Sequence, residues 1–231
     1  MEYRCVECGN AMKSLFVQYS PGNIRLMKCE RCRAAADEYI ECEIMIIVID
    51  LILQKPKAYR HLLYNVLGPK SSYFEQGLLG KLSFGFLVLD GYRSLFIDRS
   101  REQLGLSTSF SSLLWRFQKL LMDVFLGNFI FLSTFLLATR IFLSASVGSL
   151  RYKEILPAIL ISSYFKLFLL AMMVWEFPSS VVFIIDLFVV SANTVALKVI
   201  TESTTSRCVA ICSCAHFMKF LVTQVLELRS S

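Results

Sequence analysis

Near the start of the chain stand Cys5-Val6-Glu7-Cys8 and Cys29-Glu30-Arg31-Cys32, two CxxC pairs with 20 residues between them. One CxxC turn directs two thiolates toward a point, and a second turn completes a tetrahedral Zn²⁺ site. The spacing is typical of zinc ribbons, although two disulfides or free thiols are alternatives. Four protein ligands leave no open coordination position, so the predicted zinc is structural. It would contribute most of the folding energy of so small a segment, about 10–16 kcal/mol.

Residues 1–43 are predicted to form the zinc ribbon. Strand-like residues 15–19 and 24–27 flank the turn signal Ser20-Pro21-Gly22-Asn23, which predicts a hairpin between the two cysteine pairs. The segment contains six Lys or Arg and seven Asp or Glu. This slightly acidic balance argues against a nucleic-acid partner, because binding to phosphates needs a basic surface.

The turns after the two cysteine pairs differ in one residue. Gly9 follows the first pair directly and suits a tight turn that needs an open backbone, whereas Arg33 occupies the equivalent place after the second pair. Arg33 is therefore a mild departure from the pattern expected of two similar knuckles.

The composition indicates a membrane protein. Of the 231 residues, 55% are hydrophobic, the mean hydropathy is +0.57, and the apolar excess lies after residue 77. The net charge of +6 is spread along the chain, which we interpret as membrane-surface and topology charge. The first 15 residues lack an apolar signal region, so we expect no cleaved signal peptide. Zinc thiolates need a reducing compartment, so the ribbon is expected to be cytosolic.

Residues 44–77 are predicted to lie at the membrane surface. Ile44–Leu53 is apolar apart from Asp50 and is too short to span a bilayer, so it predicts a buried helix or one in the interface. Residues 55–65, which we call the collar, mix basic and aromatic side chains. This composition suits anionic lipid head groups, with a solvated connector as the alternative. The candidate lipid or partner residues of the collar are Lys57, Tyr59, Arg60 and His61.

Residues 78–200 are predicted to form an α-helical membrane bundle of about four spans, and residues 201–231 a C-terminal helix. Among the predicted spans the first is the weakest, because it carries Lys81, Asp90 and Arg93. The C-terminal segment Cys208–Leu226 is either a fifth span or an amphipathic surface helix. The four predicted spans are Leu78–Ile97, Leu120–Thr139, Ile155–Trp175 and Val181–Ile200.

The loop charges predict the orientation of these spans. With four spans and a cytosolic ribbon, the basic loop at 140–154 and the C-terminal tail are cytosolic. The turn at 176–180, which has no Lys or Arg, is then lumenal. The basic loop at 98–119 fits this arrangement less well, since it falls on the lumenal side. A three-span arrangement would expose the charges of 140–154 instead, so we prefer four.

Two charges inside the predicted spans form a candidate site. Lys166 lies near the middle of one span and Asp186 near the start of the next, about 13 Å and 8 Å from their shared end at 1.5 Å per residue. A lysine side chain can bridge that offset, so we predict a Lys166–Asp186 pair that binds a lipid head group or sterol hydroxyl. The alternative is that Lys166 extends to the interface and Asp186 lies near it.

The remaining polar residues give little support for catalysis. The sequence has no GxSxG, Walker A or HExxH motif, and its two histidines are 155 residues apart, so no catalytic residue is predicted. His216 with Asn193 is a weak candidate for an embedded acyltransferase site. Cys208, Cys212 and Cys214 are interpreted as packing residues, with palmitoylation or a second metal site with His216 as open alternatives.

Several motifs occur together in the order of one known family. After the two CxxC pairs come Asp37-Glu38-Tyr39-Ile40-Glu41, Ile49-Asp50-Leu51 and Lys55-Pro56-Lys57-Ala58-Tyr59-Arg60-His61-Leu62-Leu63-Tyr64-Asn65. This combination resembles the homology domain of the Arv family, the ACAT-related proteins required for viability. Residues 161–170 and 195–200 resemble the same family.

The resemblance implies a function in lipid homeostasis. It implies a non-enzymatic multi-pass protein of the endoplasmic reticulum membrane, with the Golgi membrane as a further location, that distributes sterols, regulates sphingolipid metabolism and supports glycosylphosphatidylinositol (GPI) anchor synthesis. The implied partners are membrane lipids, namely sterol, sphingolipid or GPI precursor, and a lipid-synthesis enzyme complex. The alternative is a membrane-embedded lipid-modifying enzyme or an accessory subunit of one.

Overall fold

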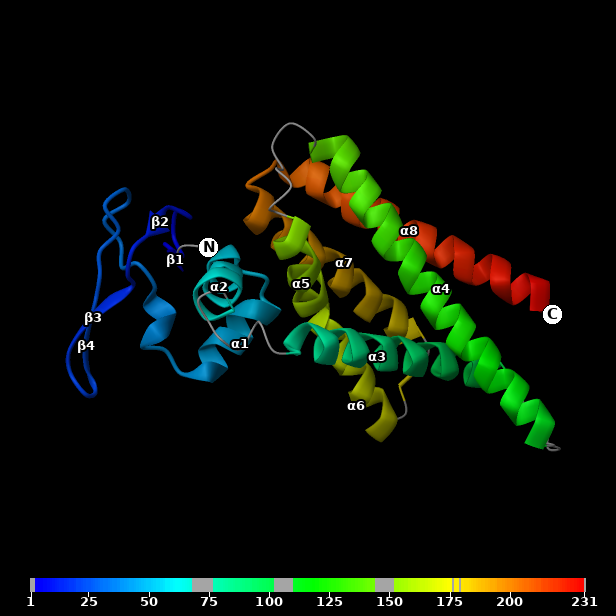
Figure 1. Ribbon diagram of the computed structural model, residues 1–231. Coiled ribbons are helices and arrows are strands. Elements are labelled where there is room, and N and C mark those ends of the chain that lie inside the picture. Colours follow the sequence, from blue (N-terminus) through cyan, green and yellow to red (C-terminus); the bar gives the residue numbers. More distant parts are fainter. Residues whose placement is uncertain are drawn as a thin grey trace. The chain divides into compact units, whose positions relative to one another are not determined.

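A computed structural model of the chain describes residues 3–67, 77–101, 110–143, 152–175, 177–178 and 180–230. The chain divides into two compact units, Met1–Leu79 and Gly80–Ser231. The first contains two small strand pairs and short helices, and the second is helical (Figure 1). This arrangement confirms the predicted fold class of a helical membrane bundle with a small β-rich N-terminal module.

Two antiparallel strand pairs build the ribbon. Strand β1 (Tyr3–Arg4) pairs with β2 (Ala11–Met12), so the first cysteine pair lies in the turn between them. Strand β3 (Phe16–Ser20) pairs with β4 (Asn23–Leu26), which is the predicted hairpin. Its turn contains Gly22 at φ +83°, a left-handed conformation that glycine adopts without a steric penalty.

The ribbon has a small apolar core. The core consists of two groups of buried side chains: one contains Cys5, Met12, Leu15, Cys29 and Ala36, and the other contains Val6, Tyr39 and Ala58. The cysteines are themselves members of the first group, and the second group contains residues from both the ribbon and the collar. Because so few apolar side chains are buried, the ribbon needs further stabilisation from hydrogen bonds between its polar groups and from metal binding by its thiolates.

Short helices follow the strands in the same unit. They are η1 (Glu38–Ile40), α1 (Ile44–Ile52), α2 (Pro56–Arg60) and the π-helical turn η2 (His61–Val66). Pro56 occupies the first turn of α2, where its missing N–H costs nothing. No residue of α1 is buried, so the structure excludes a fully buried helix and leaves the interfacial interpretation.

In the described part of the second unit, the helical elements are α3 (Leu78–Arg101), α4 (Phe110–Leu143), α5 (Tyr152–Ser162), η4 (Ser163–Leu167), α6 (Phe168–Val174), α7 (Ser180–Thr201) and α8 (Thr205–Ser230). The long helices α4 and α8 lie side by side, and α7 packs against both α5 and α8 (Figure 1). The elements α5, η4 and α6 follow one another without a break, so they form one helical rod with a tighter 3₁₀ turn at its centre.

Among the described residues, four helical segments of the second unit are long and apolar enough to cross a membrane: Phe117–Leu143, Glu154–Ala171, Ser180–Thr201 and Thr205–Leu226. The predicted number of spans is therefore matched, but the membership differs. Helix α3 is absent from this set because Lys81, Asp90 and Arg93 make it too polar. The C-terminal helix α8 takes its place.

Parts of the predicted loops lie outside the described residues. These parts are residues 68–76 of the predicted linker, 102–109 of the loop at 98–119, 144–151 of the loop at 140–154, and positions 176 and 179 of the turn at 176–180. The predicted sidedness counted residues 78–97 as the first span. It stays a prediction, since α3 is not among the candidate spans.

Candidate metal centre and polar cavity

The four N-terminal cysteines converge on one point. All four sulfur atoms lie within 4.8 Å of one another, and the Sγ–Sγ distances are 3.7 Å for Cys5 and Cys32 and 3.6 Å for Cys8 and Cys29. A regular tetrahedron with zinc–sulfur bonds of about 2.3 Å has sulfur atoms about 3.8 Å apart. The structure has no disulfide between these cysteines, since sulfur atoms 3.6 Å apart are too distant for a disulfide bond of about 2.05 Å. The site can therefore hold one tetrahedral metal ion.

The two cysteine pairs lie in matching turns. The Gly9 N–H donates to the Cys5 carbonyl at 2.9 Å, and the Arg33 N–H donates to the Cys29 carbonyl at 2.8 Å. Gly9 has φ +75° and Arg33 has φ +61°, so both turns need a left-handed residue at this place. The departure noted in the sequence thus affects only the side chain, because Arg33 adopts the backbone conformation that Gly9 has.

The thiols of this cluster differ in acidity. Backbone N–H groups of Cys32 and Arg31 point at Cys29 and lower its pKa to about 7, against the opposing effect of burial. Burial raises the pKa of Cys5 to about 12. A divalent cation stabilises the thiolate form of every ligand, so metal binding would release protons and depend on pH.

Replacing Gly9 with alanine is expected to destabilise the first unit by about 1–2 kcal/mol, because a side chain at φ +75° meets the following carbonyl. The new Cβ would lie 3.7 Å from Arg60 Nε, an ordinary contact, so the backbone carries the cost. The measurement is the rate at which a chelator removes metal from the full chain. Gly22→Ala is the control, because it introduces the same backbone strain in the β3–β4 turn. If a chelator removed the metal equally fast from both variants, the effect would not be specific to the turn that follows Cys8.

A buried carboxylate connects the ribbon to the collar. The Asp37 side chain is fully buried and accepts hydrogen bonds from the Tyr39 backbone N–H at 3.1 Å and the Asn65 side-chain amide at 2.6 Å. Its Oδ2 also lies 2.7 Å from His61 Nδ1. Asn65 in turn exchanges two 2.9 Å hydrogen bonds with the Arg4 backbone. This network fixes η2 against strand β1.

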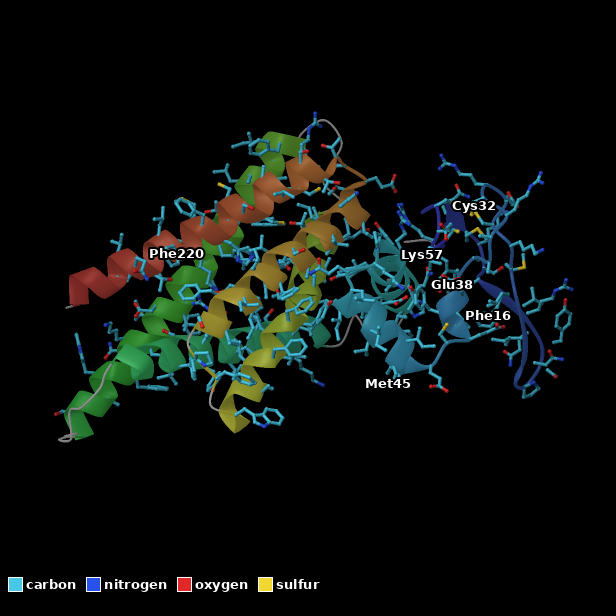
Figure 2. The ribbon with its side chains drawn as sticks, turned by 180° about the vertical axis from the view of Figure 1, so that it is seen from behind. Phe16, Cys32, Glu38, Met45, Lys57 and Phe220 are labelled. Carbon is cyan, nitrogen blue, oxygen red and sulfur yellow. The ribbon has the colours of Figure 1, made fainter. Side chains whose placement is uncertain are left out.

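Three of the predicted lipid-binding residues of the collar, Lys57, Arg60 and His61, contact the ribbon. Tyr59 and His61 are buried. Arg60 Nη1 donates to the carbonyls of Val6 and Glu7 at 2.8 Å and 2.7 Å. Lys57, which is partly exposed, forms an ion pair with Glu7, and its Nζ lies 3.6 Å from Glu38 Oε1 (Figure 2).

Lys57, Arg60 and His61 thus use polar groups to hold the collar to the ribbon, and their role in binding a lipid or partner stays a prediction. Basic and aromatic composition alone cannot distinguish groups that face lipid from groups that complete a neighbouring module. The spacing of His61 and Asn65, one helical turn apart, together with the acidic Asp37, was the available signal for an internal network.

Asp37→Ala is expected to destabilise the first unit by about 3–5 kcal/mol, because His61 and Asn65 would lose a shared buried acceptor. The measurement is the temperature at which the purified full chain loses its metal. Glu41→Ala removes an exposed carboxylate from the same region and serves as the control. Equal stability of the two variants would show that the network contributes nothing.

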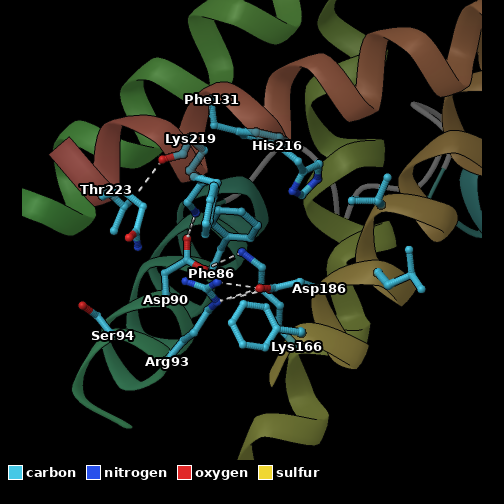
Figure 3. Close-up of a pocket in the computed structure, with 15 residues that line it drawn as sticks. Phe86, Asp90, Arg93, Ser94, Phe131, Lys166, Asp186, His216, Lys219 and Thr223 are labelled. Carbon is cyan, nitrogen blue, oxygen red and sulfur yellow. Dashed lines mark hydrogen bonds and ion pairs between the residues drawn. The ribbon is translucent and has the colours of Figure 1, made fainter. Parts of the chain in front are cut away.

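A cavity of about 380 Å³ lies within the second unit (Figure 3). Its polar residues come from four elements that are far apart in the sequence: α3, η4, α7 and α8. Both predicted residues, Lys166 and Asp186, line it, together with Asp90, Arg93, His216 and Lys219. Its apolar residues include Phe86, Phe131, Phe183, Leu187 and Phe220.

The ion pairs in the cavity differ from the predicted pair. Lys166 Nζ donates to Asp90 Oδ1 at 2.6 Å, and Asp90 Oδ2 accepts from Lys219 Nζ at 2.5 Å. Asp186 instead accepts from Arg93, through Nε at 3.1 Å and Nη2 at 2.5 Å. The prediction of a direct Lys166–Asp186 pair was wrong, because it took into account only helices that are neighbours in the sequence. Helix α3 supplies both missing partners, Asp90 and Arg93, from one face.

A second polar cluster adjoins the cavity. Asn193 Nδ2 lies 3.2 Å from His216 Nε2, and the Ser162 hydroxyl donates to Asn193 Oδ1 at 2.6 Å. The weak pairing of Asn193 and His216 noted in the sequence is therefore a contact. Cys208 and Cys212 are buried and Cys214 is exposed. Within the described residues, the four N-terminal cysteines are the only group of His, Cys, Asp or Glu arranged to hold a metal, so the second metal site gains no support.

Comparison with known proteins identifies the family. A model of the Arv1-like family matches residues 4–197. The chain belongs to the Arv1-like family. It is 55% identical to Protein ARV 2 of Arabidopsis thaliana over 96% of this chain and 93% of that protein, and 53% identical to Protein ARV 1 of the same plant over 98% and 89%. It is 30% identical to human Protein ARV1 over 86% and 72%. No solved structure matches the chain.

The Arv1-like match extends across both units. It begins one residue before Cys5 and ends at residue 197 within α7, so it includes the metal centre and the cavity residues Asp90, Arg93, Lys166 and Asp186. Helix α8, which contributes Lys219 and His216, follows the matched region. The family predicted from the N-terminal motifs is confirmed.

Proposed function

We propose that this Arv1-like protein is a non-enzymatic membrane protein of the endoplasmic reticulum, and also of the Golgi, that distributes sterols between membranes. By the same proposal it regulates sphingolipid metabolism and supports GPI-anchor synthesis. The observation that carries the proposal is the cavity in the helical unit, where charged groups lie beside aromatic walls (Figure 3). An amphipathic cavity of this kind suits a lipid, which has a polar head and an apolar body.

The burial of the charged side chains supports a role of the cavity in binding a lipid, in addition to any structural role. The side chains of Lys166 and Asp90 are only 4% and 5% exposed. Charged side chains among membrane helices are costly and generally mark a functional pathway or site. They lie beside a cavity large enough for a head group, rather than in a closed core.

The alternative of an embedded enzyme rests on Ser162, Asn193 and His216. Asn193 contacts both the Ser162 hydroxyl and His216 Nε2, so the amide stands between a nucleophile and its potential base. General-base activation of serine needs direct hydrogen-bond reach to the histidine. This geometry favours a structural network between α5, α7 and α8. Lipid turnover by the purified protein that is lost in His216→Ala would favour the enzyme instead.

For the N-terminal unit we propose a structural Zn²⁺ ion and a cytosolic position at the bilayer surface. Four thiolates at tetrahedral spacing suit zinc, and a site without an open position suits a structural role. Helix α1 supports the surface position, because Ile44 is 74% exposed and Met45 is 62% exposed (Figure 2). Asp50, the single charge in α1, bonds to Tyr39 and Lys55, which leaves the exposed face apolar.

A photoactivatable phospholipid with the reactive group in its acyl chain is expected to label α1 in reconstituted full-length protein, because its apolar side chains would enter the interface. Replacing Ile46 and Ile49, which are 46% and 50% exposed, with aspartate should strongly reduce that labelling. Peptide mass spectrometry gives the readout, and labelling of α4 in the same sample is the internal control. Unlabelled α1 beside labelled α4 would contradict the surface position.

The overall proposal is tested by purifying the full chain in mild detergent and analysing it by mass spectrometry for lipids, partner subunits and zinc. We expect sterol, sphingolipid or GPI precursor to copurify, together with subunits of a lipid-synthesis complex. Lys166→Leu should reduce the copurified lipid and disturb cellular lipid distribution. Unchanged lipid binding and phenotype in that variant, at equal expression, would remove the cavity from the proposal.

A further inference from the structure

Among the residues that the structure describes, the charges that line the cavity do not balance. Three of these lining side chains are cationic, namely Arg93, Lys166 and Lys219, and two are carboxylates, Asp90 and Asp186. The difference, three minus two, leaves one positive charge in excess. An uncompensated charge among membrane helices is unfavourable, so an anion bound at this surface would be stabilised by the excess positive charge.

The hydrogen bonds identify where that anion fits. Asp90 is shared by the ammonium groups of Lys166 and Lys219, so one carboxylate serves two cations. A lysine ammonium has three N–H donors, and within the described residues Lys166 donates a hydrogen bond only to Asp90. Its Nζ also lies 3.5 Å from the centre of the Phe86 ring. Lys166 therefore retains donor capacity beside the cavity.

The outer wall of the cavity indicates that the anion belongs to a lipid. Phe183, Leu187 and Phe220 line the cavity and yet are 59%, 69% and 45% exposed. They lie on α7 and α8, two of the candidate membrane spans. Acyl chains could thus lie along these side chains while a head group reaches the buried cations.

We propose that this cavity binds the anionic phosphate of a phospholipid head group, with Lys166, Lys219 and Arg93 supplying the positive charge and Phe183, Leu187 and Phe220 contacting the acyl chains. The inference rests on the proposed function and specifies its ligand class. It selects a lipid with one net negative charge over a sterol hydroxyl or a zwitterionic head group. A phosphate oxygen accepts charge-assisted hydrogen bonds, which are stronger than those to a neutral hydroxyl.

The test is native mass spectrometry of the purified full chain titrated with dioleoyl phosphatidylglycerol, dioleoyl phosphatidylcholine or cholesterol. The two phospholipids have the same acyl chains and differ in net charge. We expect phosphatidylglycerol to bind at least about tenfold more tightly than the other two, the effect of one charge-assisted hydrogen bond. Inorganic phosphate in a separate arm distinguishes a lipid from a soluble phosphate, and strong competition by it would overturn the lipid assignment.

Two variants change the charge of the cavity in opposite directions. Lys219→Gln retains amide donors toward Asp90 and Asn128 but brings the net charge to zero, so phosphatidylglycerol binding should fall about tenfold. Asp186→Asn raises the net charge to two and removes the partner of Arg93, so binding should become several-fold tighter. A folding defect could weaken phosphatidylglycerol binding in Lys219→Gln, but it could not produce the tighter binding expected of Asp186→Asn.

Lys198→Gln is the matched control, since it removes a lysine charge from the exposed surface of α7 outside the cavity. Equal phosphatidylglycerol affinity in Lys219→Gln, Asp186→Asn and Lys198→Gln would overturn the inference. Cavity binding of cholesterol in preference to phosphatidylglycerol would overturn it too, while leaving the lipid-handling function intact. Binding of none of the lipids would contradict both.

Discussion

Replacing Cys29 with alanine is expected to unfold the N-terminal unit of the full chain. The four sulfur atoms lie within 4.8 Å of one another, and loss of one leaves three ligands that hold a structural ion poorly. Metal binding contributes about 10–16 kcal/mol in small zinc modules, which exceeds the stability that the few buried side chains around Cys5, Met12 and Leu15 can supply.

The measurement is the zinc content of the purified chain together with limited proteolysis between residues 1 and 67. We expect zinc to fall from one ion per chain to none, and the ribbon to be cleaved rapidly. A chelator should have the same effect on the unaltered protein. Cys214→Ala removes an exposed cysteine in α8 and is the control. A ribbon that resists protease after complete chelation would show that Asp37 and the apolar core suffice without metal.

The metal centre was predictable because its signal is local. Two CxxC pairs bring four ligands together through short turns, and each turn needs only its own backbone hydrogen bonds. The candidate membrane spans in α4, in the α5–η4–α6 rod and in α7 were predictable for a similar reason, since apolar length is visible within one segment. Composition marked α3 as the weakest predicted span through Lys81, Asp90 and Arg93, but it could not show which distant residues compensate the charges of Asp90 and Arg93.

The cavity shows why the remaining contacts could not be predicted. Lys166 was expected to pair with Asp186, 20 residues away, but its partner Asp90 is 76 residues away on α3. Either carboxylate satisfies the chemistry of an ion pair, and only the packing of the helices selects one. The collar shows the same principle, since Arg60 reaches backbone carbonyls of Val6 and Glu7 that carry no signal in the sequence.

Asp90→Leu is expected to be the most destructive single change in the helical unit. Asp90 is 5% exposed and accepts from both Lys166 and Lys219, so its loss would leave two ammonium groups close together without their carboxylate. Removing one member of a buried ion pair costs about 3–5 kcal/mol. For a chain of this size the unfolding temperature in detergent should fall by on the order of 10 °C.

A second substitution distinguishes charge from packing as the cause. In the double variant Asp90→Leu with Lys166→Met, the cavity again has one excess positive charge, so we expect most of the lost stability to return. If instead the two substitutions add, Asp90 acts through its shape and the ion pairs contribute little. Fluorescence-detected thermal unfolding of Asp90→Leu, Lys166→Met and the double variant measures this coupling. The coupling energy between Asp90 and Lys166 shows how strongly these ion pairs hold α3 against η4 and α8. It therefore also shows whether the charged cavity is a fixed feature of the bundle.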